Sequence, residues 1–320
     1  MALIRRLPLN PKIDFLGRRK LFLVFSACLM VASLAAVAIL GLNLGVDFRG
    51  GILIEIGTHE PADLADLRRR LGGLDLGQVT LQEFGAANDV LINVERQDGD
   101  EKAQIKAIQA VKTELGGLVA EYRRVEFVGP KVGGELKRAG LLATVLALAG
   151  IGVYIWFRFE WQFAAAALTA LIHDVLSTIG FFALLQIEFN LATLAALLTI
   201  AGYSINDTVV IFDRVRETLR KYKKLYILDL LNLALNGTLT RTVLTSVTTL
   251  IALVCLFAFG GQVIRGFSAG LIWGIVIGTY SSIGLAVPLL SFMNLRGVAG
   301  GEEEEASKAA EGAEEAAAGQ

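Results

Sequence analysis

One carboxylate lies inside a stretch of sequence that is otherwise apolar and long enough to cross a lipid bilayer. The stretch runs from Leu191 to Phe212 and contains Asp207, with Asn206 beside it. A charge in the hydrocarbon layer costs about 2.5–3.5 kcal/mol or more, so it is retained where it has a partner, a proton or water. Asp207 is therefore predicted to belong to a proton or ion pathway. The alternative is a carboxyl group that is hydrogen-bonded permanently to a neighbouring helix and serves packing alone.

A cation that could pair with this carboxylate lies in a later apolar segment. Arg241, Thr245 and Thr248 recur there at helical spacing and share one helix face. An arginine always stays charged, so pairing with Asp207 in one state and release in another would make a switch. Two alternatives remain open at this point. Arg241 could simply extend to the membrane surface, and the hydroxyl groups could bond their own helix backbone.

His173 and Asp174 form a second ionisable pair, in the middle of another apolar stretch. Ionisable groups at that depth face the interior of a helix bundle rather than lipid. His173 could relay protons, or it could be an ordinary buried hydrogen-bond donor. Asp213 differs, because it precedes Arg214 at the end of its stretch and is expected to be a helix-end charge. The predicted proton pathway comprises Asp207, Arg241, Asp174, His173, Thr245 and Asn206.

The composition favours a membrane protein and excludes several other classes. Of 320 residues 54% are apolar, and the mean hydropathy is +0.58, whereas soluble domains are roughly 45–50% apolar. A net charge of −1 gives no reason to expect a nucleic-acid partner. Two histidines and two cysteines without ligand spacing predict no metal site. With no nucleophile–base set or phosphate loop either, we expect no enzyme activity and no cofactor, only coupling to protons.

Six apolar segments reach the length of ~20 residues that a spanning helix needs. They are Leu21–Leu42, Ala139–Phe157, Phe163–Leu185, Leu191–Phe212, Thr242–Phe259 and Phe267–Phe292. Lys and Arg gather before the first segment and between the fourth and fifth, which places both termini in the cytoplasm. The first segment could instead be a cleaved signal, but its apolar run of ~20 residues exceeds the ~7–15 of a signal core.

The long stretch between the first two spans, residues 43–137, is expected to fold as one extracytoplasmic α+β domain. Its apolar residues follow strand and helix periods in turn: strand 52–56, helix 61–71 with Pro61 in its first turn, strands 79–84 and 90–95, helix 102–115 and strand 121–128. This βαββαβ order is that of a ferredoxin-like domain. The remaining divisions are a cytoplasmic N-terminus over 1–20, the first span over 21–42 and a five-helix remainder of the membrane domain over 138–293.

Two further features carry structural expectations. Gly266, Gly270, Gly274 and Gly278 recur every four residues in the sixth span, and such a ridge of small residues lets helices approach closely. Residues 294–320 are rich in Ala and Glu, with four consecutive acids at Glu302–Glu305. Such a segment cannot bury a core and is predicted to be a disordered cytoplasmic tail.

Five segments, in order along the chain, resemble the SecD/SecF family of protein-export membrane proteins. They are Gly45-Val-Asp-Phe-Arg-Gly-Gly51, the run 201–217 around Asp207, the run 239–250 around Arg241, and the segments 259–268 and 278–283. The likeness extends over most of residues 14–293. The family also shares its membrane plan with the resistance-nodulation-division transporters.

The resemblance implies an accessory subunit of Sec translocation in the bacterial cytoplasmic (inner) membrane. It implies SecD, the SecYEG channel, YajC or YidC, and translocating preproteins as partners. The proton-motive force would promote translocation, with Asp207 and Arg241 in the proton pathway. The structural motif would comprise Gly45, Asp47, Phe48, Gly50 and Gly51. A self-contained proton-coupled transporter of small solutes or lipids and a purely structural scaffold subunit are the alternatives, although a single six-span unit without an internal repeat favours a protein that needs a partner.

Overall fold

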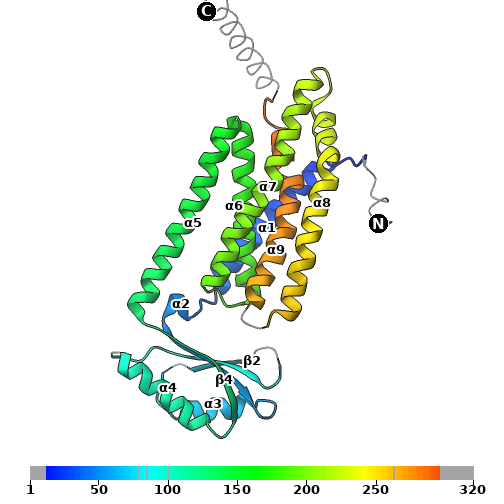
Figure 1. Cartoon of the computed structure of the whole chain (residues 1–320). Helices are drawn as coiled ribbons and strands as arrows, with labels where there is room; N and C mark the ends of the chain where they lie inside the picture. The colour runs from blue at the N-terminus through cyan, green and yellow to red at the C-terminus, as the bar shows by residue number, and fades with distance from the viewer. Residues whose placement is uncertain (1–11, 78, 84–85, 100, 262–263, 296–320) are drawn as a thin grey trace, which may run out of the picture.

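The computed structural model describes residues 12–295, apart from 78, 84–85, 100 and 262–263. A bundle of long helices stands on a small α/β domain, and the described chain both begins and ends away from that domain (Figure 1). We call the end of the bundle opposite the α/β domain the distal end. The predicted disordered tail lies, from residue 296 onward, outside the described residues.

Within the described residues, six helical stretches are long and apolar enough to cross a membrane, which confirms the predicted class. They are α1 (Arg19–Leu40), α5 (Pro130–Arg158), α6 (Trp161–Leu185), α7 (Leu191–Lys221), α8 (Ile227–Phe259) and α9 (Arg265–Ser281), the last continued by a π-helical turn (Ser282–Ala286) and α10 (Val287–Leu290). The predicted fifth span, Thr242–Phe259, is only the second half of α8. The first half of that helix buries Leu230 and Leu231 in the main core of the bundle.

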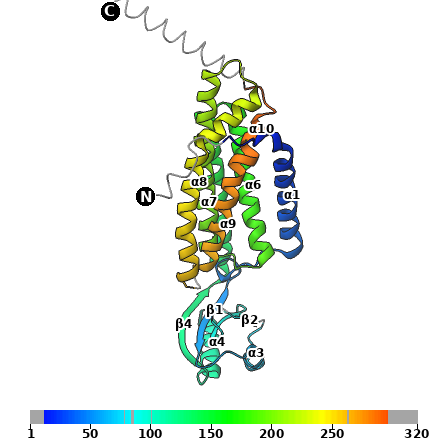
Figure 2. The same ribbon diagram turned by 90° about the vertical axis from the view of Figure 1, so that its right-hand side faces the viewer.

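The centre of the bundle is formed by α6 and α9. In the most apolar window of α9 67% of the residues are buried, against 17% in α5 and 11% in α1. Figure 2 shows α1 at one edge of the bundle, beside α6. Tight contacts of the glycine ridge hold α9 in place: Gly266 faces Ile187, Gly270 faces Phe182 of α6, and Gly274 and Gly278 face Ile200 and Ser204 of α7.

The α/β domain follows the predicted order of strands and helices. Its elements are β1 (Gly51–Thr58), α3 (Leu64–Gly72), β2 (Val79–Glu83), β3 (Asp89–Val94), α4 (Glu101–Leu115) and β4 (Val119–Val128). The strands form one antiparallel sheet in the order β2-β3-β1-β4, so β1 is a central strand. The helix predicted from Pro61 begins instead at Leu64, because the Asp63 side chain accepts hydrogen bonds from the backbone of Ala65 and Asp66 and caps it there.

Candidate functional site

Asp207 is buried inside the helix bundle, with 4% of its surface exposed. Its Oδ2 atom has no hydrogen-bond partner among the described residues, and no ion pair of Asp207 within 4.0 Å occurs among them. A buried oxygen without a donor is costly while the carboxylate carries its charge. Protonation removes that charge, so the geometry suits a carboxyl group that exchanges a proton.

Arg241 lies within reach of Asp207 but does not bond to it. Tyr203 of α7 donates to Thr249 of α8 at 3.3 Å. Because the two helices run in opposite directions, this contact puts Asp207 level with Thr245 and Arg241 one turn, about 6 Å, nearer the distal end. Arg241 is the cation whose charge acts on Asp207. Its side chain is exposed on the surface of α8, and we expect a change of its rotamer to bring the two charges together.

Two other residues of the predicted proton pathway, Asn206 and Thr245, lie nearer the surface of the bundle than Asp207 does. Asn206 is exposed on the outer face of α7. Thr245 donates to the backbone oxygens of Arg241 and Thr242 on its own helix, at 3.1 and 3.0 Å, which is the structural alternative considered for such hydroxyl groups. Among the described residues, neither side chain therefore supplies a hydrogen bond to the bare Oδ2 of Asp207.

Asp174 of α6 stands at the centre of a second, fully bonded cluster. It is completely buried, and its Oδ2 accepts hydrogen bonds from Ser204 of α7 at 2.5 Å and Ser281 of α9 at 2.7 Å. Its Oδ1 lies 2.9 Å from Nδ1 of His173. Three central helices are thus joined through one carboxylate. Nε2 of His173 is buried without a partner in the described part of the chain.

The two carboxylates differ in what they can do. Asp174 has contacts on both oxygens and ties α6, α7 and α9 together, whereas Asp207 has a bare oxygen. Ser204 belongs to the Asp174 cluster and precedes Asp207 by three residues, so both carboxylates act on the same face of α7. We therefore expect Asp174 to position the helix and Asp207 to exchange the proton.

Besides Ser204, three further hydroxyl groups of this region were not among the predicted site residues. Ser281 bonds Asp174, and Ser282 pairs with Thr208 of α7 at 2.8 Å. Ser282 also begins the π-helical turn that interrupts the last span, and such turns are frequent at functional sites. The visible signal in the sequence is two consecutive serines in an apolar run.

The predicted Gly45–Gly51 motif forms a joint between the bundle and the α/β domain. The Gly45 backbone N–H donates to Phe189 O at 3.0 Å, and Phe189 N–H donates back to Asn43 O at 2.7 Å. Asp47 Oδ2 accepts from the backbone N–H of Leu191, the first residue of α7, at 2.9 Å. Phe48 stacks on Phe189. The chain that leads into β1 is therefore fastened to the start of the helix that carries Asp207.

The two glycines that end the motif turn the chain from a short helix, α2 (Val46–Arg49), into β1. Gly50 and Gly51 have φ values of +74° and +128°, which glycine adopts readily and other residues rarely do. A Cβ atom on Gly51 would also lie 2.9 Å from Val94 O on β3. Bulkier residues would strain this entry into the sheet.

A charged group of the joint lies outside the spans. Glu188 is half-buried and lies against Gly45. A Cβ atom added to Gly45 would lie only 2.5 Å from Oε1 of Glu188. Burial raises the pKa of Glu188, Arg124 of β4 opposes the rise, and Asp47 adds to it. The pH can therefore change the charge at the joint.

Comparison with known proteins identifies the chain. Residues 107–296 match the model of "Protein export membrane protein SecD/SecF, C-terminal", and residues 35–62 match that of the "SecD/SecF GG Motif". The chain belongs to the SecD/SecF family. The second match contains the joint, Gly45 to Gly51. Family membership agrees with the resemblance drawn from the sequence, and with six spanning-length helices it makes the chain a multi-pass membrane protein.

Relatives in the SecD/SecF family match nearly the whole chain. "Protein translocase subunit SecF" of Cereibacter sphaeroides is 48% identical over 296 residues, covering 90% of this chain and 91% of the relative. The protein of that name from Rickettsia bellii is 44% identical over 291 residues, covering 90% and 95%.

Solved structures of SecDF share the fold. The crystal structure of SecDF, a translocon-associated membrane protein from Thermus thermophilus, superposes with a TM-score of 0.81 at 32% identity. A crystal structure of SecDF in a super-membrane-facing form superposes with a TM-score of 0.65, also at 32% identity. The match covers 88% of this chain but 39% of the first SecDF chain, and 94% but 40% of the second. This chain therefore spans about two fifths of each SecDF chain.

Proposed function

We propose that this chain is an accessory subunit of the Sec protein translocase that works with SecD and uses the proton-motive force to promote preprotein translocation. Membership of the SecD/SecF family and relatives named as translocase subunits support the Sec role. The observation that carries the coupling to protons is the bare, buried Oδ2 of Asp207 within reach of Arg241.

The cycle is proposed to begin with Asp207 as an anion that attracts Arg241. Proton uptake from one side of the membrane neutralises Asp207 and releases Arg241, which returns to the exposed surface of α8. Proton loss to the other side restores the attraction. Each half-cycle shifts α7 against α8. Asp174 and its serine donors keep α6, α7 and α9 together during that shift, so α7 moves with the central helices rather than alone.

The movement is proposed to reach the α/β domain through the joint. A displacement at the start of α7 pulls on Asp47 through the Leu191 N–H and on Gly45 through Phe189. Because Gly50 alone separates α2, which contains Asp47, from β1, the central strand is proposed to follow. The solved SecDF structure described as a super-membrane-facing form supports a fold with more than one arrangement.

The surroundings follow from the same proposal. The bilayer is the bacterial inner membrane, and both termini are in the cytoplasm. The distal end of the bundle faces the cytoplasm, and the α/β domain lies on the other side, where it meets the preprotein. The weakly buried helices α1 and α5 offer broad apolar faces to lipid or partner. SecD is proposed to cover part of these faces, with the SecYEG channel, and YajC or YidC, as further partners. Proton transfer without bond-making enzyme chemistry suffices for this role.

Export measured in inverted membrane vesicles with SecD present tests the proposal. Asp207→Asn should leave the protein folded and assembled while the proton-driven part of preprotein export disappears. Asp213→Asn is the matched control, since Asp213 lies on the same helix but is half exposed and pairs with Arg158 at 3.2 Å. Export by Asp207→Asn that still responds fully to the proton-motive force would overturn the assignment.

A scaffold role is the second candidate, and the self-bonded Thr245 favours it for part of the site. Recovery of the complex with SecD, measured on the same membranes, separates the two. If Arg241→Leu lowers recovery of the complex in proportion to export, Arg241 serves assembly. If recovery is unchanged and proton-driven export is lost, Arg241 serves coupling.

A further inference from the structure

The chain just before the first span is fastened to the first half of α8. Residues 13–17, which we call the strap, lead through a short helical turn (Leu16–Arg18) into α1. Among the described residues, five hydrogen bonds join the strap to Asn232 and Asn236 of α8, across 216–223 positions of sequence. Figure 2 shows α1 and α8 at opposite edges of the bundle. The strap therefore ties together two spans from opposite edges.

Both asparagine side chains bond the backbone of the strap. Asn236 bonds one residue twice, because its Oδ1 accepts from the Ile13 N–H at 3.0 Å and its Nδ2 donates to Ile13 O at 2.9 Å. Asn232 Oδ1 accepts from the N–H groups of Phe15 and Leu16 at 3.0 and 3.1 Å. Since the two asparagines are four residues apart, they share one face of α8. The backbone of the strap thus fixes both the position and the rotation of this helix.

Asp14 closes the strap with its side chain. Its Oδ1 accepts from Asn232 Nδ2 at 2.7 Å and from the Gly17 N–H at 2.8 Å. A Cβ atom on Gly17 would overlap Oδ2 of Asp14, so this turn requires a glycine. The bond from Gly17, and then that from Asn232, hold the pKa of Asp14 below its usual range. The strap therefore keeps a charged acceptor for Asn232 at neutral pH.

A buried side chain holds the strap from below. Leu16 is 0% exposed and belongs to the main hydrophobic cluster of the bundle, together with Leu231 and Leu235 of α8. Leu231 and Leu235 immediately precede Asn232 and Asn236. Apolar packing and hydrogen bonds thus hold the strap to the same two turns of α8.

The fastened part of α8 lies close to the proposed proton site. Arg241 follows Asn236 by five residues of one continuous helix, which is about 7.5 Å along the axis. Gly237, next to Asn236, lies against α7, since a Cβ atom there would be 3.2 Å from Nε of Arg214. The position of α8 along the bundle axis therefore decides how far Arg241 is from Asp207.

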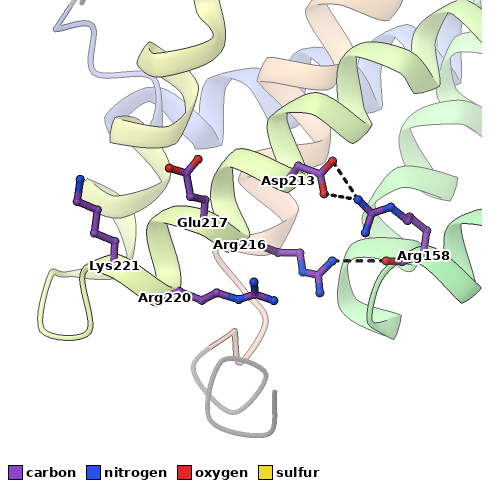
Figure 3. A pocket seen from close by; sticks show the side chains of 6 residues that line it. All are labelled: Arg158, Asp213, Arg216, Glu217, Arg220 and Lys221. Carbon is purple, nitrogen blue, oxygen red and sulfur yellow. Dashed lines mark hydrogen bonds and ion pairs between the residues drawn. The ribbon is translucent and has the colours of Figure 1, made fainter. Parts of the chain in front are cut away.

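At the same end of the bundle α7 is fastened to a different neighbour. Asp213 pairs with Arg158, the last residue of α5, at 3.2 Å, and Arg216 donates to Arg158 O at 3.5 Å (Figure 3). These side chains line a pocket at the distal end of α7. Because α7 contacts α5 there and α8 contacts the strap, a shift of α7 against α8 does not require the strap to break.

We propose that the strap fixes α8 along the bundle axis, and that Asn232 and Asn236 are positioning residues that hold Arg241 at the level from which it reaches Asp207. The inference rests on the proposed proton cycle. In each half-cycle α7 shifts with the central helices, while α8 stays with the start of α1. If α8 were free to follow α7, the shift would no longer separate Arg241 from Asp207.

Hydrogen exchange on the full chain, assembled with SecD in nanodiscs, tests whether the strap is held in this way. Asn232→Asp replaces the amide donor with a second oxygen that faces the Asp14 carboxylate. Exchange of the amides in residues 13–17 should quicken by about tenfold, as expected when a bond to a charged group is lost. Adding Asp14→Asn exchanges donor and acceptor across the same pair and should restore slow exchange. Asn232→Ala, which brings no repulsion, should quicken exchange at Phe15 and Leu16 too.

Proton-driven export in membrane vesicles, measured over a series of pH values, tests the positioning role. A nearby cation favours the charged form of a carboxyl group, so displacement of Arg241 in Asn232→Asp should move the midpoint of the pH profile upward by up to about 1 unit. The other ionisable groups of the site, His173 and Asp174 of α6, are the same in every variant. Adding Asp14→Asn should return the midpoint to the wild-type value. A bond that served folding alone would change the amount of complex without moving the midpoint.

Lys224→Gln is the matched control, because it lowers the charge near the start of α8 by the same one unit outside the strap. It should change neither exchange nor the pH profile. Unchanged exchange in Asn232→Asp, or no recovery with Asp14→Asn, would overturn the strap. Faster exchange with an unmoved midpoint would overturn the positioning role. Failure of the proton cycle itself gives a different result, since Asp207→Asn would then keep proton-driven export while exchange in the strap responds as predicted.

Discussion

The contact between α9 and α7 is closest at Gly274, and its replacement by alanine should destabilise the bundle. A Cβ atom at this position would overlap the Cδ1 and Cγ1 atoms of Ile200 and lie 2.7 Å from its Cγ2. Ile200 is 1% exposed and packs among buried residues of α9, Ile275 and Leu271 included. It therefore has little room to move aside.

The expected magnitude follows from two opposing effects. Alanine is favoured over glycine inside a helix by ~0.8–1 kcal/mol, and overpacking a filled core costs ~1–3 kcal/mol. Because three atoms of Ile200 are involved, the cost belongs in the upper part of that range. The free energy of unfolding should therefore fall by about 1–2 kcal/mol in Gly274→Ala.

The matched control is Gly202→Ala on α7, where a Cβ atom would have no neighbour within 4 Å. This variant keeps the helix-propensity gain without the clash, so its stability should equal or exceed that of the wild type by up to about 1 kcal/mol. Titration with sodium dodecyl sulfate, followed by circular dichroism, measures both. A Gly274→Ala protein as stable as Gly202→Ala would refute the close approach of α9 to α7.

The remaining predictions concern Asp174, Asp47 and Glu188. Asp174→Ala should lose about 2–4 kcal/mol of stability in the same titration, because buried serine donors lose their acceptor and a cavity remains. Asp47→Ala should lose about 1 kcal/mol with the bond at the start of α7, and hydrogen exchange at Leu191 should quicken, whereas Asp47→Asn keeps an acceptor and should change less. Since burial raises the pKa of Glu188, the folded protein holds that proton more tightly than the unfolded chain, and this group's contribution to stability falls as pH rises above its ordinary value. Glu188→Gln removes that fall, so its thermal stability relative to wild type should increase toward high pH.

Each of these predictions has an outcome that contradicts it. Wild-type stability of Asp174→Ala would show that Ser204 and Ser281 do not depend on that carboxylate. Unchanged exchange at the Leu191 amide in Asp47→Ala would remove the bond from the joint. A stability difference for Glu188→Gln that is the same at every pH would mean that Glu188 titrates equally in the folded and unfolded chains.

Much of the membrane fold can be predicted from the sequence because the rules involved are local. The cost of charge in lipid singles out Asp207 and Asp174, and the number of spans and the βαββαβ order follow from hydropathy and its period. Boundaries are less predictable where tertiary packing decides them. The start of α8 is an example, because residues such as Leu230 extend the helix by burial in the core rather than by membrane hydropathy.

The partners of the polar residues could not be predicted, because they depend on contacts between distant segments. Ser281 reaches Asp174 across 107 positions and Asp47 reaches Leu191 across 144, and no local pattern relates them. The split between a bonded Asp174 and a bare Asp207 likewise depends on which helices lie next to each other. The proton pathway assigned to Asp207, Arg241, Asp174, His173, Thr245 and Asn206 stays a prediction.

Proton flux measures the central claim most directly. Proteoliposomes that contain this chain with SecD, a translocating preprotein and a trapped pH-sensitive dye are given a pH gradient, and the dye is followed. The account predicts proton movement for the wild type and for Asp213→Asn, and none above the protein-free rate for Asp207→Asn. Wild-type proton movement in Asp207→Asn, with the complex intact, would contradict it.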